Sequence, residues 1–373
     1  MVLDDICVLI ADCPHSTAPD EGSGYPLIRT PNIGKARFFL DGVHRVSKQV
    51  YEQRNKRATP QDNDIIFARE APAGNAAIIK NGDKYCLGQR TVLIRPDPQK
   101  VNPDYLVYYL LAPEQQHKLL STAHGATVSH VNIPDIHNMN VDNLPSIENQ
   151  KQIANTLIAY DDLIENNQKQ IKLLEEAAQR LYKEWFINLR FPGHESTPIH
   201  NGIPEGWSRK TVTDLLEIRY GKDHKALADG AIPVYGSGGI MRKVEPVLYS
   251  GESVLIPRKG SLNNILFVTG DFWTIDTMFY SIPKAPNIAK YMYLFLSRLD
   301  MYSFNIGAAV PSMTVKILDG INVLLPSAEI LLRFESVISS VFEKKRVLEK
   351  QIETASQARD RLLPKLMSGE VEV

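Results

Sequence analysis

Several short stretches carry residue types that could do chemistry, but none has the spacing that the chemistry needs. YGKDHK at 220–225 lacks the spaced Gly-Lys-Ser/Thr pattern with which a phosphate-binding loop cradles a nucleotide. VYGSGGIMRK at 234–243 is rich in Gly, but the residues after it favour a strand, whereas a dinucleotide site requires a helix there. PDPQK at 96–100 and the Pro-Asp pairs at 103–104 and 134–135 lack the acidic-x-Lys pair of a nuclease and are typical of turns.

The sequence predicts neither a catalytic residue nor a metal ligand. It has no Asn-Pro-Pro-Tyr-like tetrapeptide, so an amino-methyltransferase site is missing. His124, His130 and His137 lie close together, but the aligned positions of the internal repeat described below hold no His, which favours satisfied or exposed histidines. We therefore expect that the chain is not an enzyme and holds no cofactor.

The elements that organise the chain follow from an internal repeat. GATVSHVNIPDIHNMNVDNLPS at 125–146 resembles GAAVPSMTVKILDGINVLLPS at 307–327. An offset of 182 places Gly125 on Gly307 and Val128 on Val310; after one extra residue in the first copy, the offset becomes 181. The offset of 181 then holds without a gap for about forty residues, which indicates a duplicated architecture.

Each copy continues into a long segment whose apolar residues recur in steps of three and four. This period predicts a helix over 145–187 and another over 326–366, each entered at a Pro-Ser pair. Pro192 and Gly193 stop the first helix, and Pro364 is expected to kink or end the second. The predicted seam residues are Ile153, Leu157, Ile164, Asn167, Ile171, Leu174 and Leu181 in the first helix, and Phe334, Ile338, Val341, Leu348, Ile352 and Leu362 in the second.

Two such helices in one chain can bury their seams against each other. An antiparallel pair would place two globular domains at opposite ends of a rod, related by a pseudo-twofold axis. The alternative is that each helix packs only on its own domain. Polar residues at the seam positions 167, 345 and 359 would cost stability, and they either fix the register or face a third, partner helix.

The two globular halves are predicted to be mixed and β-rich, because short apolar runs alternate with Gly, Asn, Asp and Pro turns in both. The halves share a framework and diverge in their loops. The fold class is therefore α+β, with two pseudo-repeated domains and an antiparallel coiled coil. The predicted divisions are a first domain at 1–144, a helix at 145–187, a linker at 188–203, a second domain at 204–325, a helix at 326–366 and a tail at 367–373.

Charge is distributed unevenly along the 373 residues, although the net charge is only −1. Residues 29–57 hold eight basic and two acidic side chains, and residues 209–260 hold nine basic and six acidic. Local positive charge on the globular halves favours a polyanion as partner, whereas a solvated surface is the alternative. No apolar run is long enough to span a membrane and no signal peptide is recognised; the three cysteines, Cys7, Cys13 and Cys86, indicate reduced thiols in a cytoplasmic protein.

The layout and several strings together resemble the specificity subunit of type I restriction–modification systems. The resemblance covers essentially the whole chain. Its strings are IPEGWSRKTVTDLLEIRYGK, IPVYGSGGI, VLIPRKGS, LGQRTVLIRP, NIPDIHNMNVDNLPSIENQKQIANTL and RLLPKLMSGEV.

This resemblance implies that each globular half is a target-recognition domain for one half of a split, asymmetric double-stranded DNA site. It also implies that the coiled coil sets the unread gap and docks two modification subunits. Those subunits would carry S-adenosylmethionine and methylate adenine N6, and restriction subunits driven by ATP, with Mg, would join them. The first half lacks the Pro-Glu-Gly-Trp lead-in of the second, so its edge is expected to be trimmed.

Polar loop residues are the candidates for DNA contact, Lys and exposed Arg for phosphates, and Arg and Asn near Gly turns for base edges. In the first half these are Arg29, Lys35, Arg37, Arg45, Lys48, Arg69 and Arg90; in the second they are Arg219, Lys222, Tyr235, Ser237, Arg258, Lys259, Asn263 and Asn264. The competing hypotheses are an enzyme with a disguised site and a coiled-coil scaffold without a DNA role. The sequence leaves the bases read and the gap length open.

Overall fold

The structure is a computed structural model that describes residues 1–121, 130–142, 144–304 and 311–372. The repeat pairs Gly125/Gly307 and Val128/Val310, and His124, lie outside these ranges. The chain forms two compact units: unit 1 is Met1–Asn167 with Gln351–Val373, and unit 2 is Gln168–Lys350. None of the helices in the described ranges has the length and apolar character that crossing a membrane requires.

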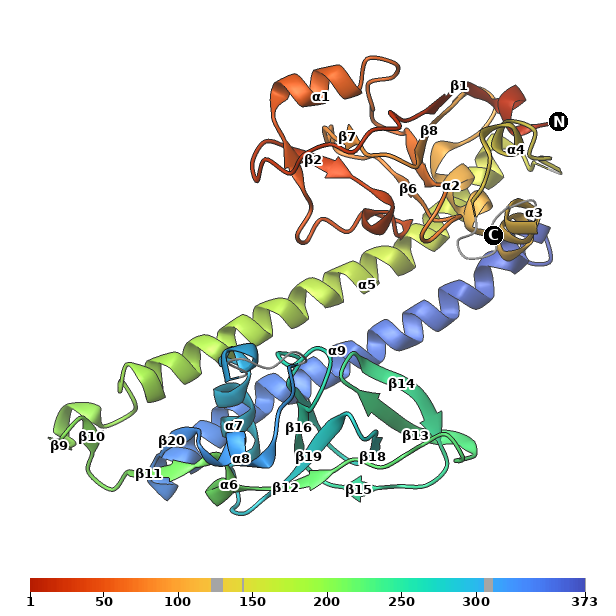
Figure 1. Ribbon diagram of the computed structural model, residues 1–373. Coiled ribbons are helices and arrows are strands. Elements are labelled where there is room, and N and C mark those ends of the chain that lie inside the picture. Colours follow the sequence, from red (N-terminus) through yellow and green to blue (C-terminus); the bar gives the residue numbers. More distant parts are fainter. Residues whose placement is uncertain (122–129, 143, 305–310, 373) are drawn as a thin grey trace. The chain divides into compact units, whose positions relative to one another are not determined.

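Unit 1 is built on a five-stranded sheet with a smaller three-stranded sheet beside it (Figure 1). The large sheet has the order β1 (Cys7–Asp12), β8 (Thr91–Pro96), β5 (Ile65–Ala68), β6 (Ala76–Ile78) and β3 (Lys35–Ala36). The small sheet has the order β4 (Arg45–Val46), β2 (Tyr25–Ile28) and β7 (Cys86–Leu87). The shorter helices are α1 (Lys48–Arg54), α2 (Pro103–Leu111), α3 (Pro113–Ser121) and α4 (Ile133–His137).

Unit 2 has two four-stranded sheets and two short ribbons. The first sheet has the order β12 (Leu216–Tyr220), β19 (Met278–Pro283), β16 (Ser253–Pro257) and β17 (Leu266–Val268). The second has the order β14 (Gly239–Val244), β13 (Asp229–Gly236), β18 (Asp271–Thr274) and β15 (Tyr249–Ser250). The ribbons pair β11 (Ser208–Thr211) with β20 (Asn322–Leu325) and β9 (Ile199–His200) with β10 (Ile203–Pro204); the short helices are α6 (Val212–Leu215), α7 (Ala289–Leu296) and α8 (Val315–Asp319).

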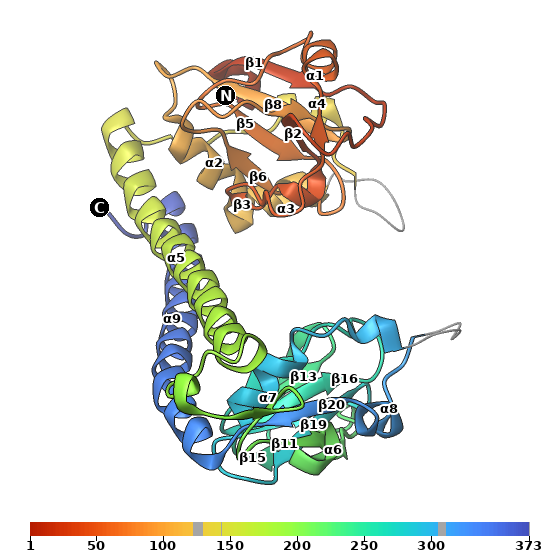
Figure 2. The same ribbon diagram turned by 90° about the vertical axis from the view of Figure 1, so that its left-hand side faces the viewer.

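The two units repeat one topology, which confirms the predicted α+β duplication. The order β1-β8-β5-β6 in unit 1 matches β12-β19-β16-β17 in unit 2. The parallel pair β2–β7 matches β13–β18, since Leu27 pairs with Cys86 as Val234 pairs with Trp273. Helix α2 packs on β6 and β3, and α7 packs on β16 and β17, so the apolar faces of both sheets are covered by a corresponding helix (Figure 2).

The long helices are α5 (Ile147–Tyr182) and α9 (Ala328–Ser368). Ser146 and Ser327 accept hydrogen bonds from backbone N–H groups of the first turns, so the Pro-Ser pairs cap both helices. Of the two expectations for Pro364, a kink or the end of the second helix, the end is wrong, because α9 continues to Ser368. Proline there removes one backbone donor, but the last turn is held because Leu366 is buried in the core and Leu362 packs against it.

The segment 188–203, predicted to be a linker, has structure of its own. A π-helical turn at Lys183–Ile187 follows α5, and the β9–β10 hairpin begins inside the segment. The ring centroids of Phe191 and Trp207 lie 4.8 Å apart in the core of unit 2. This aromatic contact anchors the segment, because burying a ring removes a large apolar surface from water.

Within unit 1, the first half of α5 packs antiparallel against the last part of α9. Asp161 contacts Arg359 and Asn167 contacts Gln351, so position increases on one helix as it decreases on the other. Polar seam residues therefore face each other across the pair. The alternative that each long helix packs only on its own domain does not describe unit 1.

Unit 2 contains the corresponding antiparallel packing. Lys345 donates to Glu175 at 2.6 Å, and Phe334 lies against the rings of Tyr182 and Phe186. Every predicted seam side chain of both helices is buried or half-buried. The same three-and-four spacing thus serves the helix pair and the domain cores.

Phe334 is expected to be a main stabilising residue of unit 2, because it is 0% exposed and its ring centroid lies 4.8 Å from that of Phe186. Phe334→Ala should lower the free energy of unfolding of unit 2 by about 3–5 kcal/mol, measured by urea denaturation followed by tryptophan fluorescence. Leu332→Ala is the matched control, since Leu332 is 59% exposed on the same helix and should change stability little. Equal losses in the two variants would contradict this packing.

Candidate nucleic-acid interface

Three loops of unit 2 meet at one end of its sheets. The N–H of Lys222, after β12, donates to Thr274 O at 2.8 Å, and the N–H of Ile275 donates to Tyr235 O at 3.1 Å. The Asn264 side chain then donates to Ser237 O at 2.8 Å. These bonds bring together the segment after β12, the β13–β14 turn and the β16–β17 connection, which hold most of the residues predicted to contact DNA in this half.

Arg258 is held at this junction in one orientation. Its Nη1 donates to Asp276 O at 2.6 Å, and its guanidinium lies 4.8 Å from the ring centroid of Tyr220 and 5.3 Å from that of Phe279. The Nε is buried and has no hydrogen-bond partner among the described residues. A planar guanidinium fixed in this way is suited to a bidentate contact.

The two asparagines of the β16–β17 connection are hydrogen-bonded within unit 2. The Asn263 side chain donates to Asp300 at 3.1 Å and accepts from the Met301 N–H at 2.7 Å, while Asn264 fastens the β13–β14 turn. Gly260, with a φ of 78°, lies so close to Ser237 that an added Cβ would be 2.5 Å from Oγ. Both Asn side chains, predicted to contact DNA, make hydrogen bonds within the protein; Asn263 is exposed and Asn264 is half-buried.

The remaining candidates of unit 2 differ in their exposure and in their side-chain partners. Lys222 and Lys259 are exposed, and neither side chain has a partner within the described part of the chain. Arg219 forms an ion pair with Glu217. Tyr235 is half-buried, and desolvation raises its pKa, so it remains a neutral donor and acceptor. The two lysines are therefore the best placed for phosphate contacts.

Unit 1 repeats the backbone frame of this junction. The N–H of Arg69 donates to Arg90 O and the N–H of Val131 donates to Arg69 O, as Arg258 donates to Thr277 O and Met313 donates to Arg258 O. Asn75 donates to Ile33 O at 2.9 Å, which corresponds to the contact of Asn264. The framework, with its Arg and Asn, is common to both units, whereas the surroundings of the Arg side chain differ.

Arg69, predicted to face DNA, lies inside unit 1. It is 7% exposed, its Nε donates to Val131 O at 2.9 Å, and its Nη1 lies 3.2 Å from Asp12. Its Nη2 lies 2.6 Å from His130 Nε2. The buried guanidinium thus ties β1 to the segment before α4, and Arg69 is a weak candidate for a DNA contact.

The histidines of this region are hydrogen-bonded to carboxylates. His130 Nδ1 lies 2.7 Å from Glu70, which also binds Arg90 at 3.0 Å, and His137 Nδ1 lies 2.8 Å from Asp4. Among the described residues, no group of three or more His, Cys, Asp or Glu side chains has the arrangement of a metal site.

The other basic candidates of unit 1 divide into bound and free. Arg37 forms ion pairs with Asp162 and Glu165 of α5, so it fastens its loop to the helix and is a weaker candidate for DNA. Arg45 donates to Gly24 O at 2.8 Å, and Lys48 lies 3.7 Å from Glu52. Lys35 is exposed without a partner in the described ranges, and the half-buried Arg29 keeps its Nε unpaired there.

Sequence reasoning missed two pairs of exposed apolar side chains in these loops. Phe39 and Leu40 lie within the basic segment 29–57 of unit 1 and are 62% and 41% exposed; Ile240 and Met241, at the start of β14, are 60% and 56% exposed. Phe39 is held in place, since its N–H donates to Asn32 O and its carbonyl accepts from the Asn32 amide. Large apolar residues within three positions of a Gly in basic segments were the available signal.

A duplicated sheet and a repeated loop junction define the class, a two-domain protein with cations on both junctions that have no partner among the described residues. Comparison with known proteins identifies the family. Residues 1–176 and 204–354 each match the type I restriction modification DNA specificity domain.

Relatives match over nearly the full length. The chain is 26% identical to the type I restriction enzyme MjaIX specificity subunit of Methanocaldococcus jannaschii, over 94% of this chain and 88% of that one. It is 20% identical to the HindI specificity subunit of Haemophilus influenzae, over 83% and 86%. The crystal structure of the S subunit of a type I restriction–modification system from M. genitalium has the same fold, with a TM-score of 0.62 at 17% identity over 98% and 95% of the chains.

The chain belongs to the type I restriction–modification DNA specificity family. It is a DNA-recognition subunit with two specificity domains, and members of this family are the non-catalytic component of their complexes.

The side chain of Asn264 is expected to hold the β13–β14 turn in place. Asn264→Ala removes one hydrogen bond worth about 1 kcal/mol, so amide exchange in the turn at 236–239 should rise about fivefold. Hydrogen–deuterium exchange read by mass spectrometry measures this change. Asn322→Ala on β20 is the control; unchanged exchange in the turn of Asn264→Ala would show that the contact does not hold it.

Proposed function

We propose that the loop junctions of units 1 and 2 read the two halves of a split, asymmetric DNA site. The observation that carries this proposal is one frame repeated at Arg69 and Asn75 in unit 1 and at Arg258 and Asn264 in unit 2. The exposed side chains beside the frame differ, with Phe39 in unit 1 and Ile240 in unit 2. Two copies of one frame with different surfaces suit two different half-sites.

The contacts divide by chemistry. The free cations Lys35, Lys222 and Lys259 bind phosphates, because a flexible ammonium carries charge without fixed geometry. Arg258, fixed over Tyr220, offers a guanidinium for the acceptor edge of guanine. The exposed apolar tips at Phe39 and Ile240 suit the methyl group of thymine.

The long helices serve two further purposes in this proposal. Their length sets the number of unread base pairs between the half-sites, and their outer faces dock two modification subunits. Apolar side chains left on those faces support docking: Leu163, Leu173, Leu332 and Val337 are 44%, 64%, 59% and 46% exposed. S-adenosylmethionine for adenine N6 methylation, and ATP with Mg for restriction, belong to the partner subunits, and the complex acts in the cytoplasm.

The first test is a genome-wide map of N6-methyladenine in cells that express this chain with its modification subunit, compared with cells that lack this chain. We expect a split motif with one fixed gap, present only when the chain is expressed. No chain-dependent methylation, with all subunits expressed and assembled, would contradict the proposal and favour a scaffold.

The two free lysines of unit 2 should contribute to the salt dependence of DNA binding. In the assembled methyltransferase, Lys222→Gln with Lys259→Gln should weaken binding to all sequences alike and reduce the slope of log K against log salt by about 2. Fluorescence anisotropy from low to moderate salt measures the slope. Lys210→Gln, on β11 in a different sheet, is the control; an unchanged slope in the double variant would remove these lysines from the interface.

A further inference from the structure

A buried carboxylate joins three helices of unit 1. Asp161 of α5 is 3% exposed and accepts from Arg359 Nη1 of α9 at 2.5 Å through one oxygen. Its other oxygen accepts from the Tyr108 hydroxyl of α2, also at 2.5 Å. Tyr108 is 4% exposed, and burial beside this carboxylate raises its pKa, so it stays a donor.

The cluster Asp161–Arg359–Tyr108 is extended by neighbouring charges. Arg359 also donates to Asp360 at 2.8 and 3.0 Å, and Arg37 pairs with Asp162 on the same helix. One oxygen of Asp161 therefore links α5 to α9, and the other links α5 to α2, the helix that covers the sheet. A buried carboxylate is tolerated only while such partners remain.

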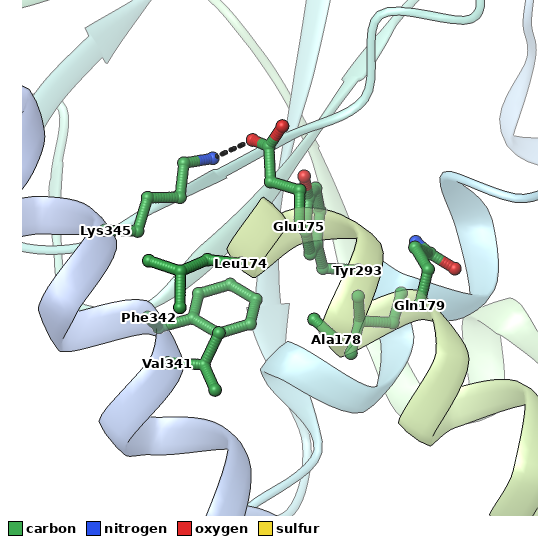
Figure 3. A pocket seen from close by; sticks show the side chains of 9 residues that line it. Leu174, Glu175, Ala178, Gln179, Tyr293, Val341, Phe342 and Lys345 are labelled. Atoms are coloured by element: carbon green, nitrogen blue, oxygen red, sulfur yellow. Dashed lines mark hydrogen bonds and ion pairs between the residues drawn. The ribbon is translucent and has the colours of Figure 1, made fainter. Parts of the chain in front are cut away.

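The corresponding place in unit 2 is apolar. The repeat offset of 181 relates Asp161 to Phe342 and Arg359 to Ala178, and the alignment of 102–112 with 288–298 relates Tyr108 to Leu294. Phe342, Ala178 and Leu294 line a small cavity of about 30 Å³ between α5, α9 and α7. Figure 3 shows this cavity, with the ion pair of Lys345 and Glu175 at its rim.

An apolar seam alone leaves the register of two long helices underdetermined. A slip of one heptad places apolar side chains on apolar side chains again. For Asp161 the same slip replaces Arg359 by Ile352 or Leu366, which leaves a buried carboxylate without its cation. The cost of an unpaired buried carboxylate therefore destabilises the slipped registers and not the native one.

We propose that the Asp161–Arg359–Tyr108 cluster fixes the register of α5 against α9, and thereby the length of the unread gap. The second part rests on the proposed function. A heptad advances a helix by roughly 10 Å, which is about three base pairs of duplex DNA. These three are positioning residues: they touch no DNA and act through the placement of the recognition domains.

The test compares two variants of the cluster. Asp161→Leu with Arg359→Leu and Tyr108→Phe imitates the apolar counterpart in unit 2, and it should keep stability because a buried ion pair can be replaced by apolar residues. Arg359→Leu alone should melt earlier, because Asp161 then lacks its cation. The single variant thus tests the effect of the cluster on stability, and the triple variant tests its effect on register without a loss of stability.

Register is read by disulfide trapping in the full chain. Asn167 and Gln351 contact each other at 3.2 Å, so Asn167→Cys with Gln351→Cys reports the native register; Asn167→Cys with Ala358→Cys reports a slip of one heptad. With the native cluster, only the first pair should cross-link. With the apolar triple variant, the second pair should cross-link as well.

Cross-linking of the native pair alone in the triple variant would overturn the proposal, whatever the DNA results. Leu157→Ile, an apolar exchange in the same seam, is the control and should leave the slipped pair unlinked. In methylation maps, the triple variant should then modify sites with additional gap lengths while both half-site sequences stay the same. A slipped cross-link with one unchanged gap would retain the register role and contradict the link between register and gap.

Discussion

The structure depends on the burial of two long apolar seams against each other. An isolated amphipathic helix of 36 or 41 residues would leave its seam in water, so α5 and α9 depend on tertiary packing for their stability. In both units the same faces also close the domain core, as Leu157 does in unit 1 and Phe334 in unit 2. Folding of the domains and pairing of the helices are for this reason one process within each unit.

Polar residues in the seam give this association its specificity. Apolar packing rewards any register that matches heptad to heptad, whereas a hydrogen bond or ion pair is made in one register only. Asn167 with Gln351, and Lys345 with Glu175, are partners of this kind. Polar residues, which lower the stability of an apolar seam, here form contacts that are made only in the native register.

In the recognition loops, the groups that hold the loop in place differ from the side chains that are exposed to a ligand. Backbone bonds and the amides of Asn75 and Asn264 hold the loops, so most polar groups there are satisfied within the protein. What remains for a ligand is a small set of side chains outside the frame, such as Lys222 and Lys259, and the exposed apolar tips. A frame that does not depend on these side chains lets them vary without loss of the fold.

The sequence alone determined the duplication, the fold class and the long helices, because period and repeat are properties of the chain itself. It also indicated which segments carry positive charge. Tertiary structure decided which charges are free: Arg69 and Arg37 belong to internal contacts with Asp12 and with the carboxylates of α5, far away in sequence. Ion pairing and burial depend on residues that only folding brings together, and therefore no local pattern could separate Arg69 from Lys35.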